Sequence, residues 1–398
     1  GGMGCRTVCE SLAVIAASLF LPVVSFECSE GSALSDTNLF PGFSRVGTIR
    51  SKVPDTMMHL QAMFGWNHLA IISDSGLQYY EQAELLQLSI PDFESTIYSV
   101  SSNNFDAVVE VMTQLVALKR RIIYFFGDEN LFRQVICASE VAGTLVGLTW
   151  ISEGIRSRVW WTEDDANVMA QSSVCDGSLI SDLYEGALFF TGVGEPLTAT
   201  DAALDCYEGY TSSTLHAEIQ SYFADGYPPT SPNRTAVDYP HDGVINYVVD
   251  GVCVFAKMVE GMLAQGYAIT DLRSPTEAVY DAVVDEIKQN IEFQGATGAV
   301  TITGNDVLNN FGIFQVSGTS FTRAGVADMH GNLNMSASDL SNSSWTEAPP
   351  DDVTSEEEFP ILAVVIPSLV LFFCAIVCCA ACTGRAAINS QAASSTET

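Results

Sequence analysis

The stretch RIIYFFGDENLFRQVICASEVAGTLVGLTWIS, residues 121–152, contains an apolar strand candidate, a helix candidate and a second strand candidate in succession. Two apolar runs joined by a helical segment are typical of parallel strands with their crossover helix. The same alternation begins near residues 68–72 and continues to residues 187–192. We therefore predict an α/β fold, in which helices cover both faces of parallel sheets.

Further helices and strands extend this pattern along the chain. Helical spacing of apolar residues predicts helices at 105–118, 129–142, 179–186, 244–263 and 276–290. Short apolar runs predict strands at 95–100, 187–192, 299–303 and 312–316, and we expect the last two to pair with each other.

The N-terminal segment LAVIAASLFLPVVS, residues 12–25, has two interpretations. A secretory signal peptide would start at Met3 and use Arg6 as its basic region. A folded segment would form a helix, because apolar residues recur at i, i+3, i+4 and i+7 from Leu12, and a short strand would follow Pro22. The local pattern leaves both interpretations open.

Composition excludes several classes of function. The 398 residues include 16 basic and 48 acidic side chains, a net charge of −32. Nucleic acids and anionic membrane surfaces need a basic footprint, so we expect neither as a partner. HExxH, GxxxxGK[ST] and GxSxG motifs are absent, and the cysteines and histidines form no metal-binding pattern. We expect no catalytic residues, no metal and no cofactor.

A membrane anchor is predicted near the C-terminus. Residues 359–383 contain no charge, and 25 residues suffice for a helix to cross about 30 Å of hydrocarbon. Arg385 follows this segment, which places the preceding chain outside and residues 384–398 in a short cytoplasmic tail. The polar residues 331–358 are predicted to form an extracellular stalk.

Three glycosylation sequons precede the predicted span, as an extracellular N-terminal region requires. The acceptor residues are Asn233, Asn334 and Asn342.

Five segments, in this order, resemble the ligand-binding region shared by class C G-protein-coupled receptors and natriuretic-peptide-type receptors. The match runs from about residue 4 to residue 320, and the segment at 121–141 is most similar to the GABA type B branch. The segments are GCRTVCESLAVIAASLFLPVVSFECSEGSALSD (4–36), LFPGFSRV (39–46), MFGWNHLAIISD (63–74), RIIYFFGDENLFRQVICASEV (121–141) and EFQGATGAVTITGND (292–306).

The resemblance implies a two-lobe clamshell of the periplasmic-binding-protein type I fold over residues 1–330. The second lobe would span about residues 76–195. Family members place several βα units before the segment that matches Gly4, so we expect an incomplete first lobe. Residues 12–25 match a helix and strand of the family, which favours the folded interpretation over the signal peptide.

The resemblance also bears on the cysteines. It implies a disulfide between Cys137 and Cys175 in the second lobe. The family residue that matches Cys5 bonds to an earlier cysteine, which is absent here, and the partners of Cys9, Cys28, Cys206 and Cys253 stay open.

The expected ligand site follows from the resemblance as well. Family members hold an amino-acid carboxylate at the start of the matching helix and in the next loop, which points to Arg6, Thr7 and Ser29. Asp128 and Ile155 stand where GABA type B receptors present a Tyr and a Trp, so Asp128 is a candidate partner for a ligand amine. The alternative is structural, with Thr7 as a helix cap, Arg6 as a surface charge, and Ser29 and Asp128 as loop polarity.

These features predict the extracellular sensing region of a plasma-membrane receptor, which binds a small amino-acid-like ligand. The resemblance implies a receptor dimer, because the family often dimerises through the first lobe, whereas the residues themselves leave the oligomeric state open. The class C type is favoured. The alternatives are the ectodomain of a single-span receptor guanylyl cyclase and a membrane-anchored binding module without signalling.

Overall fold

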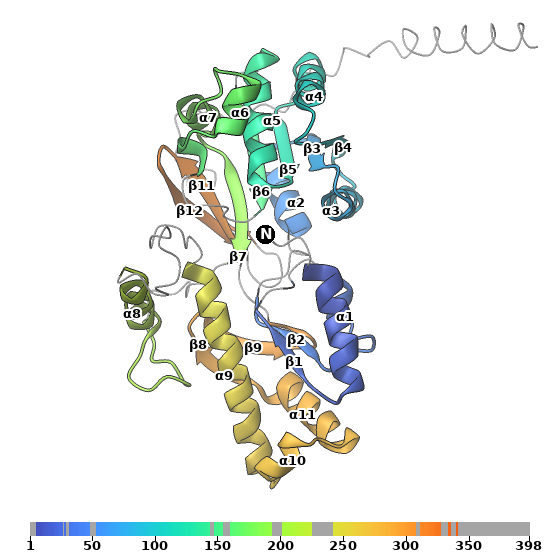
Figure 1. The fold of residues 1–398 in the computed structure, drawn as a ribbon, viewed down its shortest axis with the longest axis vertical. Helices are drawn as coiled ribbons and strands as arrows, with labels where there is room; N and C mark the ends of the chain where they lie inside the picture. The colour runs from blue at the N-terminus through green and yellow to red at the C-terminus, as the bar shows by residue number, and fades with distance from the viewer. Residues whose placement is uncertain are drawn as a thin grey trace, which may run out of the picture. The chain divides into compact units, whose positions relative to one another are not determined.

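The computed structural model describes residues 5–26, 28, 32–47, 53–143, 147–153, 160–192, 201–224, 242–307, 311–327, 333–335 and 340. All of them belong to one compact unit, Gly1–Asp351. Their strands form two sheets, one of five strands and one of eight (Figure 1). The predicted α/β class is confirmed. The side chains of Cys5, Arg6 and Thr7 lie outside the description, as do Ser29, Ile155, Asn233, Asn342 and residues 341–398.

The eight-stranded sheet has the order β13-β12-β11-β7-β6-β5-β3-β4. Its parallel part runs from β4 to β7, and the strands from β11 to β13 add antiparallel to it. The strands are β3 (His68–Asp74), β4 (Glu94–Val100), β5 (Ile122–Phe126), β6 (Thr149–Glu153), β7 (Leu188–Gly192), β11 (Phe311–Ser317), β12 (Ser320–Ala327) and β13 (Leu333–Asn334).

Helices cover both faces of this sheet, and its central strands are therefore buried on both sides. All five residues of β5 are buried, and alternate residues enter two separate apolar cores, with Tyr124 in one and Phe125 in the other. The helices are α2 (Val53–Phe64), α3 (Leu77–Ser89), α4 (Phe105–Ala117), α5 (Glu129–Val141), α6 (Ala166–Gln171) and α7 (Gly177–Tyr184).

The five-stranded sheet has the order β1-β2-β10-β9-β8. The helix α1 (Cys5–Ser18) packs on the face that holds Val23 and Phe43, whereas α9 (Asp242–Ala264) and α11 (Glu277–Asn290) pack on the face that holds Val24 and Val46. The strands are β1 (Val23–Ser25), β2 (Phe43–Arg45), β8 (Glu292–Gly295), β9 (Gly298–Thr303) and β10 (Asp306–Val307), and two further helices are α8 (Ser212–Ala224) and α10 (Ile269–Arg273).

A buried ion pair connects the segments of this smaller sheet. Arg45 is 1% exposed, and its Nε lies 2.5 Å from Oδ1 of Asp306 on the neighbouring strand. Its other nitrogens donate to the carbonyl of Cys28 at 2.5 Å and to the hydroxyl of Ser35 at 2.7 Å. One guanidinium thus joins β2, β10 and the connection that follows β1.

Three disulfides lie in the described part of the chain. Cys137 and Cys175 are bonded, which is the pairing that the resemblance implies. The structure adds Cys9–Cys28, which joins α1 to the connection after β1, and Cys206–Cys253, which joins α9 to the chain before α8, with Cα–Cα distances of 6.2 and 5.7 Å.

Most local predictions hold, but one long-range prediction is wrong. Residues 12–25 form the end of α1 and the strand β1, as the folded interpretation requires. The strands β9 and β11, expected to pair with each other, lie in different sheets, where β9 pairs with β8 and β11 with β7 and β12. The larger sheet also includes β3 and the strands β11–β13, and the predicted limits of the second lobe, about 76–195, stay a prediction.

Among the described residues, no helix is both long and apolar enough to span a bilayer. The span predicted at 359–383, with its stalk and tail, lies outside them.

The Arg45→Met substitution tests the importance of the buried pair. It leaves the Asp306 carboxylate without its charged partner in a buried site, so the free energy of unfolding should fall by about 3–5 kcal/mol. The matched control is Arg120→Met, because Arg120 pairs with the exposed Glu94 and should contribute less than about 1 kcal/mol. Urea unfolding gives both values, and equal losses would contradict the assigned role.

Candidate ligand-binding site

The parallel strands of the larger sheet bring three carboxylates to one edge. β3 ends at Asp74, β6 ends at Glu153, and Asp128 lies two residues beyond the end of β5. These strands are direct neighbours in the order β6-β5-β3, so their carboxyl ends meet at the same side of the sheet. We call Asp74, Asp128 and Glu153 the acidic edge.

The acidic edge includes the point where the strand order reverses. From β3 the chain goes to β4 on one side and then crosses to β5 on the other. The loops after β3 and β5 therefore lead in opposite directions. Ligands of open α/β sheets bind at such switch points, beyond the carboxyl ends of the strands.

The loop after β3 is held by its own carboxylate. Oδ1 of Asp74 accepts a hydrogen bond from the backbone N–H of Gly76 at 2.8 Å, and the N–H of Ser75 bonds to the carbonyl of Val100 at 2.7 Å. These two bonds fix the turn that leads into α3. Asp74 is half-buried, so part of its carboxylate faces solvent.

Asp128 caps the helix that follows β5. Its Oδ1 accepts the N–H of Leu131 at 2.8 Å, and the residue is half-buried. Asp128 therefore has a structural role as a helix cap, where the structural alternative predicted only loop polarity. The cap uses one carboxylate oxygen, and the helix dipole stabilises the negative charge at this position.

Glu153 is positioned by a buried tyrosine. The hydroxyl of Tyr124 donates to Oε1 of Glu153 at 3.0 Å, and Tyr124 itself is fully buried in the core beneath. Glu153 thus stands at the end of β6 on a rigid support.

Sequence reasoning named Asp128 and missed Asp74 and Glu153. Each of the missed residues is the last residue of a buried strand, in LAIISD and LTWISE. A polar residue at the end of a parallel strand was the available signal, but only the strand order brings these three together.

The expected carboxylate site in the smaller sheet's unit is described only in its backbone. Arg6 and Thr7 lie in the first turn of α1, where free N–H groups point along the helix axis. Their side chains and Ser29 lie outside the described residues. Asn334 is exposed at the end of β13, as a glycosylation acceptor must be. Within the described residues, no group of acidic, histidine or cysteine side chains could hold a metal ion.

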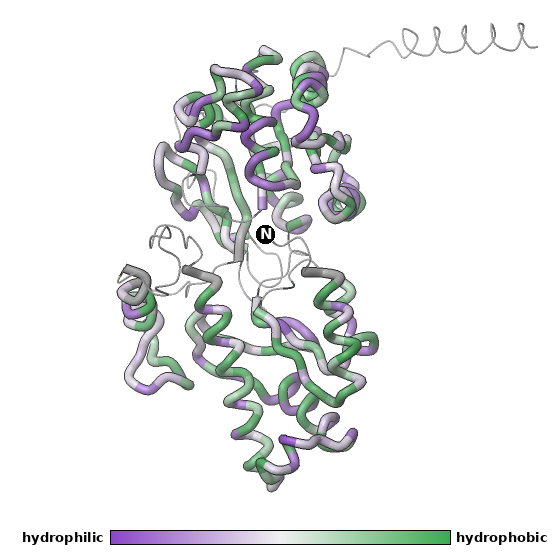
Figure 2. The backbone as a smooth tube through the Cα atoms, viewed as in Figure 1, coloured by the Kyte–Doolittle hydropathy of each residue, from purple (hydrophilic) through white to green (hydrophobic). Residues whose placement is uncertain are grey.

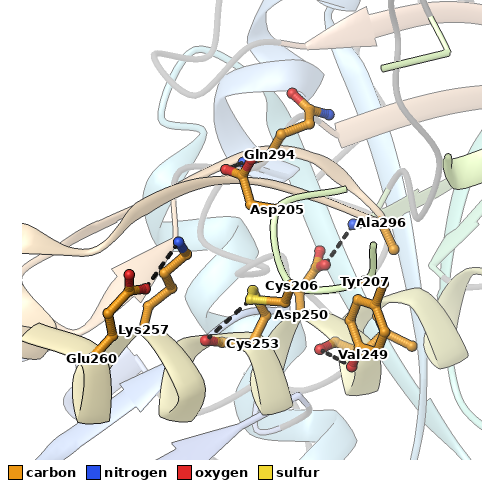
Figure 3. Close-up of a disulfide and its surroundings, with 10 residues drawn as sticks. All are labelled: Asp205, Cys206, Tyr207, Val249, Asp250, Cys253, Lys257, Glu260, Gln294 and Ala296. Atoms are coloured by element: carbon orange, nitrogen blue, oxygen red, sulfur yellow. Dashed lines mark hydrogen bonds and ion pairs between the residues drawn. A yellow bond between two sulfur atoms is a disulfide. The ribbon is translucent and has the colours of Figure 1, made fainter. Parts of the chain in front are cut away.

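The motif EFQGATGAVTITGND takes part in hydrogen bonds that stabilise the fold, and Figure 3 shows some of the residues involved. Asp250 of α9 is buried, and it accepts the N–H of Ala296 at 2.6 Å and the N–H and hydroxyl of Thr297 at 3.0 and 2.5 Å. A side chain on Gly295 would collide with this carboxylate, so the turn between β8 and β9 needs glycine there.

The last residues of the motif bind the connection between β1 and β2. Asn305 donates to the carbonyls of Leu34 and Phe40 at 2.6 and 3.0 Å, and Asp306 pairs with Arg45. These polar residues therefore stabilise the fold, and the acidic edge is left as the candidate ligand site.

The family comparison agrees with this architecture. The model of the receptor family ligand-binding region matches residues 2–319. The chain belongs to this family. It is therefore a ligand-binding region of a receptor, and its mixed α/β sheets with flanking helices are consistent with a fold of the periplasmic-binding-protein type. The comparison with curated proteins returned no match.

The pH dependence of stability tests the environment of Asp250. Burial raises the pKa of its carboxyl above the usual range, although hydrogen bonds from Thr297 and Ala296 oppose this. The folded protein therefore holds the proton more tightly than the unfolded chain. The stabilisation is complete below the unfolded pKa of about 4 and is lost as the pH rises through the raised value.

The free energy of unfolding of the wild type, minus that of Asp250→Asn, should therefore decrease as the pH rises above about 4. Asp201→Asn is a control of opposite sign, because hydrogen bonds from Ser213 and Thr211 lower the pKa of the exposed Asp201. The contribution of Asp201 to the free energy of unfolding is present above the pKa of the unfolded state, and it is lost as the pH falls through the lowered pKa. Denaturation series at several pH values measure both, and a difference that rises with pH for Asp250 would contradict its buried site.

Proposed function

We propose that this ligand-binding region is the extracellular sensor of a plasma-membrane receptor and that it binds a small amino-acid-like ligand between its two lobes. The observation that carries the proposal is the acidic edge at the switch point of the larger sheet. Carboxylates at this position suit a ligand that carries an ammonium group, since a charge-assisted hydrogen bond is about twice as strong as a neutral one.

The two ends of the ligand are assigned to different lobes. The N-terminus of α1, with Arg6 and Thr7, would hold the ligand carboxylate by its free N–H groups and positive charge. Asp128 would hold the ammonium group, with Asp74 and Glu153 adding negative potential. A ligand that contacts both lobes binds their closed arrangement more tightly than the open one, and so shifts the population towards closure.

The class C type of receptor is favoured by the resemblance of residues 121–141 to the GABA type B branch. Acidic Asp128 at a position that is aromatic in that branch argues for a different ligand or binding mode. We assign the region no catalytic role, because its polar strand-end residues suit binding, and we propose that residues 359–383 anchor it in the membrane.

The complete transcript distinguishes the class C type from the cyclase type. Six further predicted spans after residue 383 would support a class C receptor, whereas kinase-like and cyclase domains would support the other type. A stop codon after Thr398 would leave an anchored binding module.

Titration of the full chain in detergent with glutamate and γ-aminobutyrate tests the ammonium site. We expect at least one of the two to bind, and Asp128→Asn to weaken its binding by about 10- to 100-fold, the value of one charge-assisted hydrogen bond. Asparagine caps helices as well as aspartate does, so α5 should be retained. The control is Asp176→Asn, which alters an equivalent cap on α7, beside the Cys137–Cys175 disulfide. Equal losses in the two variants would reject Asp128 as a ligand contact.

Arg6→Ala tests the carboxylate site, with the titration of the full chain in detergent followed by calorimetry. Loss of the guanidinium should weaken binding of the amino-acid probe and have no effect on binding of the corresponding amine without a carboxylate. Unchanged affinity for the amino acid would remove Arg6 from the site.

A further inference from the structure

The short strand β13 presents one polar side chain between two apolar ones. It pairs antiparallel with the end of β12, and no other described strand lies beside it. Leu333 and Met335 pack against the apolar core that contains Tyr124. Successive side chains of an extended segment point to opposite faces, so Asn334 points away from this core. Asn334 is exposed accordingly.

The neighbours of Asn334 are anchored independently of it. A side chain on Gly325 of β12 would collide with Met335, which shows how closely the two segments approach. Farther along the chain, Leu340 is 7% exposed and packs in the same core as Leu333. The apolar contacts on both sides of Asn334 therefore hold the strand, and a group attached to Asn334 would disturb none of them.

Asn334 also begins an acceptor sequon, Asn-Met-Ser at residues 334–336. Of the three sequons in the chain, this is the one whose asparagine lies in the described residues. Its position at the edge of a sheet, with the side chain exposed, suits the attachment of a bulky hydrophilic group.

The edge of the sheet next to Asn334 is open over most of β12. Residues 320–325 lie against β11 on one side, and none of the described strands pairs with them on the other. At about 3.4 Å per residue, this open edge is about 17 Å long. The free N–H and C=O groups of such an edge can pair with a strand of another molecule.

The residues of this edge give it little protection of their own. Arg323 is the only charged residue among 320–325, and in a chain of net charge −32 it attracts another copy and does not repel it. Figure 2 shows mixed hydropathy along the hairpin of β11 and β12. The free backbone is therefore what makes this edge prone to association, and a covering group is the remaining means of protection.

We propose that Asn334 carries an N-linked oligosaccharide, and that this glycan prevents strand addition at the edge formed by β12 and β13. The transfer forms a bond between Nδ2 of Asn334 and C1 of the first sugar. It breaks the bond between this carbon and the pyrophosphate of a lipid-linked oligosaccharide donor, so the lipid pyrophosphate leaves and the amide gives up one proton. The inference rests on the proposed extracellular location, because this transfer takes place in the secretory pathway.

Glycopeptide mass spectrometry of the full chain, produced in secretory eukaryotic cells, tests the modification. We expect a glycan on Asn334 that is lost in Asn334→Gln and in Ser336→Ala and retained in Ser336→Thr, which keeps the sequon. An unmodified Asn334 beside a modified Asn233 or Asn342 would overturn this inference and leave the extracellular location supported. A chain without a glycan on any of the three would overturn both.

Sedimentation velocity of the purified full chain in detergent tests the protective role. Asn334→Gln and Ser336→Ala should strengthen self-association relative to the wild type by about tenfold or more, because the strand edge becomes available for pairing. The matched controls are Ser336→Thr, which retains the glycan, and Asn342→Gln, which alters a different sequon, and both should behave as the wild type.

Enzymatic release of the glycan from the folded wild type gives a second measurement that does not depend on the folding of a variant. It should strengthen self-association as Asn334→Gln does. Unchanged association after release, or an equal increase in Asn342→Gln, would overturn the protective role.

Discussion

The smaller sheet depends on the burial of one guanidinium. Arg45 contacts a carbonyl and a hydroxyl in the connection between β1 and β2, and a carboxylate on the strand β10. Arginine can do this because its planar head offers several donors in fixed directions. Removing such a charge from water is unfavourable unless every donor finds a partner, so the arrangement is also selective: other positions of these segments would leave a buried charge unsatisfied. The connection after β1, which carries the candidate Ser29, is thereby tied to the strand β10.

Polar residues in motifs have two different roles in this protein. Asp250, Asn305 and Asp306 are buried, and their hydrogen bonds shape turns and connections within the smaller sheet's unit. The carboxylates of the acidic edge are half-buried at the ends of strands, where they meet solvent. Burial thus separates the groups that stabilise the fold from those that remain available to a ligand. A motif by itself does not make this distinction.

The acidic edge meets the physical requirements of a ligand site. A ligand site needs polar groups held in position, and here a helix cap, a turn bond and a buried tyrosine hold the three carboxylates. The disulfides suit the oxidising environment outside a cell, where the proposed sensor would work.

The sequence by itself determined the local elements. Apolar runs and their spacing predicted the βα alternation, Pro22 marked the end of the first helix segment, and residues 121–152 became β5, α5 and β6 with small shifts of their ends. These features depend on contacts within a few residues, which periodicity reports directly. Tertiary structure decided the rest. The short strands β9 and β11 look alike in sequence yet lie in different sheets, and Arg45 finds Asp306 across 261 positions. Asp74, Asp128 and Glu153 likewise become one site only because β3, β5 and β6 are neighbours, and strand order is set by long-range packing that no local pattern encodes.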